Sequence, residues 1–252
     1  MLDRQMFQER RRALFAGGLL LYLAVLGVVA YLASSIDEAP GELKVSLWLQ
    51  SWRASWLDLL MYTISAPGFW KPATPIVAAT VAYLFFIGRR RESALVLLAI
   101  SFAAVANIYL KELIARPRPP DSVAEVFGSP SSFGFPSGHV MTSVVFLGML
   151  VFLFTYSKRP CIMRTLTHVT LALALLAVGL SRMYLGAHTL GDVLGGYAFG
   201  AGIVLAFASI WLLWAKPDYR ERTGPAGQGS DMVPASLQND SSLKRDRGSS
   251  VE

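Results

Sequence analysis

Residues 165–214 read TLTHVTLALALLAVGLSRMYLGAHTLGDVLGGYAFGAGIVLAFASIWLLW. This stretch contains two apolar segments, 165–185 and 189–214. Where the two segments meet, the sequence contains Arg182, His188 and Asp192. A membrane-spanning helix needs about 20 mostly apolar residues, and each segment reaches that length. The stretch therefore predicts two successive membrane helices with a polar turn between them.

Four more candidate spans precede this pair. They are residues 13–33, 72–88, 93–111 and 138–156. Six spans predict an all-α fold, a bundle of six transmembrane helices. Segment 43–70 is also apolar, but Lys44, Arg53 and Asp58 interrupt it. It is therefore predicted to be an amphipathic segment at the membrane interface, between the first and second spans.

The composition is typical of a membrane protein. Charged residues make up only 16% of the 252 residues, against about 25% in soluble domains. The net charge is +6, but the basic residues lie at the ends of apolar segments rather than along one polar face. No nucleic-acid partner is therefore expected. The single cysteine, Cys161, excludes an intramolecular disulfide.

Lysine and arginine residues mark the predicted cytoplasmic side. They precede the first span, recur in every second connection and follow the last span, which places both termini in the cytoplasm. Segment 13–33 is longer than the apolar core of a cleaved signal peptide, so it is predicted to be retained. We expect a basic cytoplasmic N-terminus at 1–12, a membrane-embedded domain at 13–216 and a disordered cytoplasmic tail at 217–252.

Three polar clusters lie where apolar segments end, and the predicted topology puts all three on the non-cytoplasmic face. Their sequences are KELIARPRP at 111–119, PSGH at 136–139 and SRMYLGAHTLGD at 181–192. Ionisable groups are costly at membrane depth and mark functional sites there. The lysine, arginines, serine, histidines and aspartate of these clusters suit the binding of a tetrahedral oxyanion.

The first cluster contributes Lys111, Arg116 and Arg118. Arginine binds phosphate through two N–H groups and lysine binds it as a point charge, so the set suits one phosphoryl group. Arg116 is a candidate for a second phosphate or headgroup contact. The alternative is a lysine that extends to the interface beside a loop that attracts anionic lipid headgroups.

The second cluster lies where a helix is predicted to begin. A helix N-terminus binds anions through its free amides and its dipole. Ser137 can donate its hydroxyl, and Gly138 allows the backbone to approach the anion closely. His139 follows in the first turn. The alternative is a capping serine beside a hydrated histidine.

The third cluster combines Arg182, His188 and Asp192. His188 and Asp192 are four residues apart at the start of a predicted helix, so the carboxylate can accept a hydrogen bond from the imidazole. Such a bond fixes the tautomer and leaves the other ring nitrogen free as a nucleophile. Arg182 adds a phosphate contact. The alternative is a polar contact that pairs two helices. The third histidine, His168, is given no catalytic role.

In these clusters the chain resembles the type 2 phosphatidic acid phosphatase family. The matching positions are Lys111 followed by six residues and Arg118-Pro119, then Pro136-Ser137-Gly138-His139, then Ser181-Arg182 with five residues before His188 and three more before Asp192. The resemblance covers the predicted third to sixth spans, and every position of the signature matches.

The resemblance implies a metal-independent lipid phosphatase with a phosphohistidine intermediate. His188 would attack phosphorus, Asp192 would orient His188, and His139 would protonate the leaving oxygen and then activate water. The phosphate oxygens would be held by Lys111, Arg118, Ser137, Gly138 and Arg182. Cationic side chains would replace the metal of other phosphoryl-transfer sites, so neither a metal nor another cofactor is expected.

The predicted substrate is a membrane lipid phosphate. The loop at 120–135 is too short for a capping domain, so the site is expected to open toward membrane lipids. Candidates are undecaprenyl diphosphate, phosphatidate and phosphatidylglycerol phosphate, with a lipid A phosphatase or a lipid phosphotransferase as the alternative. The expected location is a bacterial plasma (inner) membrane, with the site facing the periplasm or cell exterior. No oligomeric state is predicted.

Two other functions fit basic residues clustered with histidines. A vanadium haloperoxidase has a similar site, but the six predicted spans argue against it. An anion transporter or channel would also place charged side chains along a path through the membrane. Anion flux that survives His188→Ala would favour the transporter, whereas loss of phosphate release would favour the enzyme.

Overall fold

The computed structural model describes residues 2–35, 41–118, 132–155 and 160–214, and these residues form helices and no strand. In chain order the elements are α1 (Leu2–Ser35), α2 (Glu42–Gln50), α3 (Ser55–Ser65), the 3-10 helix η1 (Ala66–Gly68), α4 (Trp70–Phe86), α5 (Arg90–Ile114), α6 (Gly138–Thr155), α7 (Cys161–Tyr184) and α8 (Leu190–Trp214). The all-α prediction is confirmed. The predicted tail at 217–252 lies outside the described residues.

The helices end where the sequence contains turn residues. α5 ends before Ala115, which adopts a left-handed backbone with φ 50°, and Pro117 follows two residues later. α7 ends before Gly186, which has φ 71°. These positions favour chain reversal, because glycine tolerates positive φ and proline cannot continue a helix. α4 begins two residues before the predicted span at 72–88, and Pro75 lies inside it.

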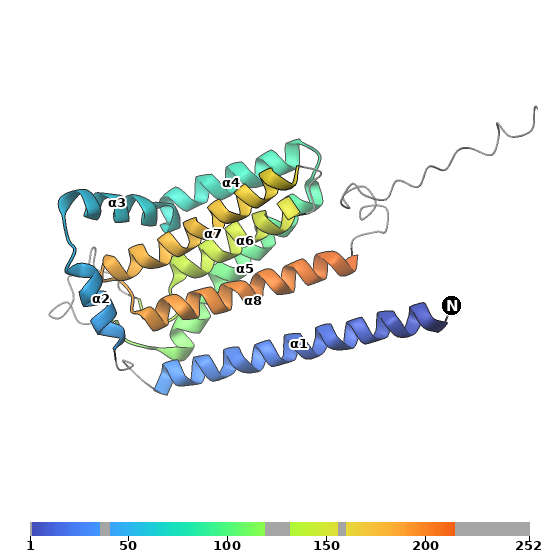
Figure 1. Ribbon diagram of the computed structural model, residues 1–252, viewed down its shortest axis with the longest axis horizontal. Coiled ribbons are helices and arrows are strands. Elements are labelled where there is room, and N and C mark those ends of the chain that lie inside the picture. The colour runs from blue at the N-terminus through green and yellow to red at the C-terminus, as the bar shows by residue number, and fades with distance from the viewer. Residues whose placement is uncertain (1, 36–40, 119–131, 156–159, 215–252) are drawn as a thin grey trace, which may run out of the picture.

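The long helices alternate in direction. Figure 1 shows α1 and α4 to α8 running along one another in turn, with the N-terminus and the end of α8 at the same end of the bundle. This arrangement agrees with the predicted order of crossings. By length and composition, α5, α6, α7 and α8 can each cross a membrane.

α3 with η1 and α4 pass the same test together, as a pair bent by 54°. Among the described residues of α1, the apolar part is Leu20–Ser35, which is shorter than that test requires. The structure therefore contains four to five candidate spans in its described part. Six crossings and an interfacial position for segment 43–70 remain predictions.

α6 lies at the centre of the bundle and packs against α5, α7 and α8. Its contact with α8 is close because α8 presents glycines. A Cβ added at Gly200 would lie 2.8 Å from the Cβ of Val144, and one at Gly196 would lie 2.9 Å from the Cβ of Val140. Small residues let membrane helices approach in this way. These contacts fix the N-terminus of α8 beside the N-terminus of α6.

The outer surface of the bundle is apolar. Large aliphatic and aromatic side chains such as Leu98, Phe102, Leu113 and Leu173 are exposed along the long helices. Apolar patches of this extent are buried by lipid in membrane proteins. The exposed surface and the apolar helices together identify the chain as an integral membrane protein.

α2, α3 and η1 cover one end of the bundle, where α5 and α7 end and α6 and α8 begin (Figure 1). The exposed tryptophans of this region are Trp48, Trp52, Trp56 and Trp70. Tryptophan is enriched at membrane–water interfaces, so this end has the composition expected there. All three polar clusters of the sequence reach the same end.

Candidate active site

His188 and Asp192 form a hydrogen-bonded pair at the start of α8. His188 Nδ1 lies 3.3 Å from Asp192 Oδ2, which also accepts a hydrogen bond of 3.1 Å from the Thr189 amide. His188 is 2% exposed and Asp192 1%. The i, i+4 contact predicted from the sequence is therefore present, and it leaves Nε2 of His188 on the opposite side of the ring.

The backbone attaches this pair to the start of α6. The Ser137 amide donates to the Asp192 carbonyl at 2.9 Å, and the Ala187 amide donates to the Arg182 carbonyl at 3.1 Å. The first bond links the second and third polar clusters, and the second closes the turn within the third. Neither bond uses the side chains that could bind substrate. The backbone therefore helps to hold the two clusters together.

Lys111 and Arg118 approach from the end of α5 and the segment after it. Lys111 Nζ donates to the carbonyls of Phe133 and Gly134, and the second of these distances is 3.3 Å. Arg118 donates to the Ala187 carbonyl, and its Nη1 lies 3.4 Å from Nε2 of His188. The first cluster therefore meets the third at the predicted nucleophile.

Arg116 does not point toward these groups. Its Nη1 lies 3.3 Å from Asp192 Oδ1 and its Nη2 lies 2.8 Å from Glu42 Oε2. Both partners are carboxylates, so the prediction of a second phosphate or headgroup contact is wrong for Arg116. Arg116 instead belongs to a buried charge network behind the histidine.

His139 lies in the first turn of α6, in a less polar environment. Its ring meets the ring of Phe69 edge-on, with centroids 4.5 Å apart and an interplanar angle of 87°. A Cβ on Gly68 would lie 2.6 Å from His139 Cδ2, so only glycine fits at that position. The η1 corner therefore forms one wall around the second histidine.

Arg182 is held by the same corner. Its Nη1 donates to Ser65 Oγ at 2.8 Å, and its guanidinium carbon lies 5.5 Å from the Phe69 ring centre. Ser65 and Phe69 were not identified from the sequence. The break of an apolar segment at Ala66-Pro67-Gly68 was the signal that could have indicated a structured corner there.

Three buried polar atoms around the histidines have no hydrogen-bond partner among the described residues. They are Ser137 Oγ, His139 Nε2 and Arg182 Nε. Lys111, Arg118 and Arg182 are also within electrostatic range of His139. Buried polar groups are normally paired, so such a set is suited to a ligand that accepts hydrogen bonds and carries negative charge.

Gly138, the remaining member of the predicted anion-binding set, lies at the start of α6. A Cβ on Gly138 would lie 2.8 Å from Asn107 Oδ1, so a larger residue would collide with the side chain of Asn107. Asn107 also donates to the Pro136 carbonyl at 3.3 Å. The glycine thus lets α5 support the turn in which Ser137 and His139 are placed.

Burial shifts the protonation of the site. Burial lowers the pKa of His188 to about 4, although the Asp192 carboxylate opposes this effect. Burial also lowers the pKa of Arg118, which still remains a cation at neutral pH because an arginine begins from such a high value. At neutral pH the site therefore pairs a neutral imidazole with a guanidinium.

No group of three or more histidine, cysteine, aspartate or glutamate side chains suited to a metal ion occurs in the described part of the chain. Metal independence remains a prediction from the basic character of the site. In this prediction, lysine and arginine would supply the positive charge that a divalent cation provides in other phosphoryl-transfer sites.

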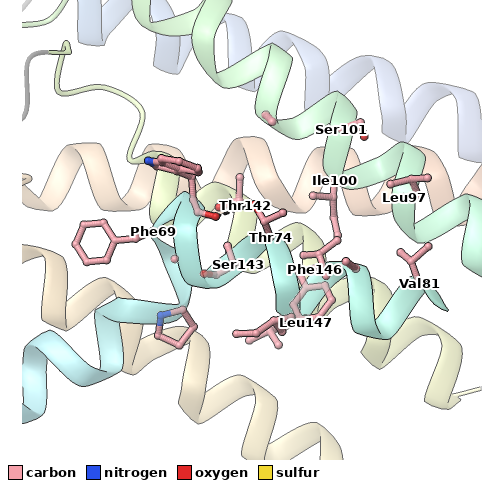
Figure 2. Close-up of a pocket in the computed structure, with 18 of the residues that line it drawn as sticks. Phe69, Thr74, Val81, Leu97, Ile100, Ser101, Thr142, Ser143, Phe146 and Leu147 are labelled. Carbon is pink, nitrogen blue, oxygen red and sulfur yellow. Dashed lines mark hydrogen bonds between the residues drawn. The ribbon is translucent and has the colours of Figure 1, made fainter. Parts of the chain in front are cut away.

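An apolar cavity of about 1470 Å³ extends from the site between α4, α5, α6 and α7. His139, Gly138 and Asn107 lie at its polar end, and Figure 2 shows Phe69 at one end of the lining and Val81 and Leu97 at the other. Trp70, Phe86 and Leu97 line the cavity and are also exposed on the outer surface. The cavity consequently reaches the lipid-facing side of the bundle.

Known proteins are similar to this chain in sequence and in fold. A family model described as the PAP2 superfamily matches residues 92–218. Phosphatidylglycerophosphatase B of Bacillus subtilis (strain 168) is 30% identical over 186 residues, which is 72% of this chain and 87% of that protein. Lipid phosphate phosphatase delta of Arabidopsis thaliana is 26% identical over 150 residues, covering 56% of this chain and 35% of that protein.

Solved structures agree. A crystal structure of a transmembrane PAP2-type phosphatidylglycerolphosphate phosphatase from Bacillus subtilis has a TM-score of 0.68 and 24% identity, covering 77% of this chain and 97% of that one. Aquifex aeolicus LpxE has a TM-score of 0.55 and 22% identity, covering 71% of this chain and 99% of that one.

The family model covers about half of the chain, including all three polar clusters, and the Bacillus relative extends the likeness over most of both proteins. The resemblance found in the sequence is confirmed. The chain belongs to the PAP2 superfamily, as a phosphatase of its lipid phosphatase group.

Proposed function

We propose that the chain hydrolyses a phosphomonoester or diphosphate of a membrane lipid through a phosphohistidine at His188. The observation that carries this proposal is the junction of two environments at His139. Buried polar atoms without a hydrogen-bond partner among the described residues surround the histidines, and His139 also lines the apolar cavity. A phosphate headgroup fits the first environment, and a lipid tail fits the second.

In the first step, Nε2 of His188 attacks phosphorus and the bond to the ester or bridging oxygen breaks. Asp192 holds the Nδ1–H of His188, so the free electron pair is on Nε2. His139 gives its proton to the leaving oxygen, which departs as the alcohol or the lipid monophosphate. Charge on the phosphoryl oxygens is balanced by Lys111, Arg118, Ser137, the Gly138 amide and Arg182.

In the second step, water attacks the phosphohistidine. His139, now neutral, takes a proton from the water as the oxygen bonds to phosphorus. The P–N bond breaks, His188 regains its electron pair, and inorganic phosphate is released. The two histidines end in their initial protonation states, so the cycle is balanced and needs no further reactant.

The cavity supports a substrate with a long tail. Its lining on α5 extends from Arg90 to Asn107, which corresponds to about 25 Å at about 1.5 Å per residue. A bilayer core is about 30 Å thick, so the cavity can hold more than the length of one leaflet. Acyl chains and a polyprenyl chain both fit this requirement. Because the Bacillus relative is named phosphatidylglycerophosphatase B, phosphatidylglycerol phosphate is the first substrate to test.

The test is phosphate release by the purified protein in detergent. Phosphatidylglycerol phosphate, phosphatidate and undecaprenyl diphosphate would be compared, with and without EDTA. We expect release that persists in EDTA and falls to background in His188→Ala. His168→Ala is the matched control, because His168 lies near the start of α7 and contacts Thr155 at the end of α6, away from the site. Release that depends on a divalent ion, or that survives in His188→Ala, would contradict the proposal.

We also propose that the site faces the periplasm or cell exterior of a bacterial plasma membrane. Arg89 and Arg90 lie at the turn between α4 and α5, at the far end of the bundle from the histidines, and basic residues favour the cytoplasm. Cys161 is exposed at that end, at the start of α7. In intact cells an impermeant maleimide should not label Cys161 and should label Ser51→Cys at the site end in a Cys161→Ser background. The reverse pattern would invert the proposed topology.

A further inference from the structure

Arg116 is a buried cation outside the sequence signature. It is 4% exposed, and it lies between the carboxylate of Asp192 on α8 and that of Glu42 on α2. Glu42 precedes residues 92–218, which match the family model. The charge network therefore joins the segment between α1 and α4 to the residue that orients the nucleophile.

The network is closely packed. A Cβ added at Gly191 would overlap the carboxylate of Glu42 and would lie 2.9 Å from Arg116 Nη1. One added at Gly134 would lie 3.0 Å from Asp192 Oδ2. The Gly134 amide also donates to the Arg116 carbonyl at 2.8 Å. With glycines on both sides, the three charged side chains have little room for another arrangement.

The two oxygens of Asp192 have separate partners. Oδ2 accepts from His188 and from the Thr189 amide, and Oδ1 lies 3.3 Å from Arg116. A carboxylate held through one oxygen can rotate about its last torsion, whereas one held through both cannot. Removing one member of a buried charge pair is costly because it leaves the other charge uncompensated.

We propose that Arg116 is a positioning residue for the reaction and that Glu42 holds Arg116 in place for this role. Arg116 fixes the carboxylate plane of Asp192 toward His188 and offsets part of its negative charge, so the imidazole remains an unprotonated nucleophile. The proposal rests on the proposed role of His188. It assigns a function to α2, whose first turn supplies Glu42.

The electrostatic part of the proposal has a definite sign. Asp192 favours the protonated imidazole, while Arg118 and Arg182 disfavour it. Arg116 affects the charge of Asp192 directly, and Glu42 does so through its ion pair with Arg116. Replacing Arg116 with a neutral residue leaves more of the negative charge of Asp192 uncompensated, so the imidazolium is stabilised. The acid limb of kcat/KM must then move to higher pH.

The experiment measures pH profiles for the wild type, Arg116→Gln, Arg116→Lys and Glu42→Gln. We expect Arg116→Gln to lower kcat roughly 100-fold, less than the about 10⁴-fold cost of losing an orienting carboxylate. Its acid limb should move upward by roughly one pH unit. Arg116→Lys should keep the acid limb near that of the wild type, since the charge is retained. It should still lower kcat, because an ammonium cannot reproduce the planar guanidinium that contacts both Glu42 and Asp192. Glu42→Gln should lower kcat by less than Arg116→Gln.

Arg89→Gln is the matched control, because Arg89 pairs with the buried Glu92 at 3.0 Å at the opposite end of the bundle. If Arg116→Gln lowers activity no more than Arg89→Gln and leaves the acid limb in place, Arg116 has only a structural role and the inference is wrong. If Arg116→Gln does not fold, the other two variants decide. A displaced acid limb in Arg116→Lys overturns the inference. Wild-type kinetics in both Arg116→Lys and Glu42→Gln also overturn it. Activity in His188→Ala would instead reject the proposed function, so the two failures are distinguishable.

Discussion

The two histidines of the site occupy contrasting environments. His188 is enclosed by charges, with Asp192 on its Nδ1 side and Arg118 on its Nε2 side. His139 lies against the aromatic ring of Phe69 at the polar end of the apolar cavity, and its Nε2 has no partner among the described side chains. One ring is held by hydrogen bonds and the other by packing.

This contrast matches two chemical tasks. A nucleophile needs one tautomer and one orientation throughout the reaction, and a carboxylate hydrogen bond supplies both. A group that alternates between acid and base needs an unoccupied nitrogen close to the bond that breaks. In the proposed reaction that bond joins the phosphate to the lipid, so it would lie where the charged part of the site meets the cavity. The position of His139 fits the second task and that of His188 the first.

Removing the hydrogen bond of His188 should have the largest effect on this contrast. In Asp192→Asn the side chain can offer an N–H to the imidazole and stabilise the wrong tautomer. We expect kcat to fall about 10⁴-fold, by analogy with other histidines oriented by a carboxylate. The control is Asp58→Asn. In the wild type the Asp58 carboxylate accepts a hydrogen bond of 2.7 Å from the Tyr184 hydroxyl at the same end of the bundle. A loss of similar size in both variants would show that the effect is structural.

His139 is tested by the leaving group. A general acid contributes roughly 10² to 10⁴-fold when the leaving oxygen is a poor leaving group. His139→Asn should therefore lower kcat/KM, which reports the steps up to departure of the leaving group, by that factor for a lipid phosphate and by much less for p-nitrophenyl phosphate, whose leaving group needs little protonation. A loss of equal size for both substrates would assign His139 to phosphate binding instead.

The pH profile sharpens the comparison further. Burial lowers the pKa of His188 to about 4, and the nucleophile must be neutral. Protonation that abolishes activity should therefore occur near pH 4 rather than near 6.5, the ordinary pKa of histidine. After correction for ionisation of the substrate, kcat/KM should not fall between pH 7 and pH 5.5, because His188 stays neutral over this range. An acid limb near pH 6.5 would show that His188 is less desolvated than the structure indicates.

The sequence was sufficient for the local parts of the site. His188 and Asp192 meet because i and i+4 residues share a helix face, and helix ends follow from glycine and proline positions. The direction of Arg116 could not be obtained this way. Arg116 and Arg118 follow the same left-handed residue, Ala115, and only tertiary contacts send one to Asp192 and the other to His188.

Residues supplied by distant segments were missed for a related reason. Ser65 contacts Arg182 across 117 positions of the chain, and Glu42 contacts Arg116 across 74. Ser65 lies in the amphipathic segment 43–70, and Glu42 directly precedes that segment. An amphipathic pattern indicates a helix and its apolar face but does not specify a polar partner. Its contribution to the site became visible only when α2, α3 and η1 were placed over the end of the bundle.

Phe69 provides the smallest and most specific test of the packing around His139. Its ring packs against the imidazole and lies under the guanidinium of Arg182, and such contacts contribute about 0.5–1.5 kcal/mol each. Phe69→Leu keeps an apolar side chain but loses the ring, so we expect kcat to fall roughly 3- to 10-fold, while Phe69→Tyr should retain most of it.

The matched control is Phe146→Leu, since Phe146 lines the same cavity on α6 two turns beyond His139. If the cavity serves only to hold the lipid tail, both leucine variants should raise KM for long-chain substrates and leave kcat unchanged. If the ring of Phe69 positions the acid, only Phe69→Leu should lower kcat, and it should do so for short-chain substrates as well. Equal changes in kcat and KM in the two variants would show that Phe69 has no special role in positioning His139. The distinction between a histidine held by packing and one held by charge would then be lost.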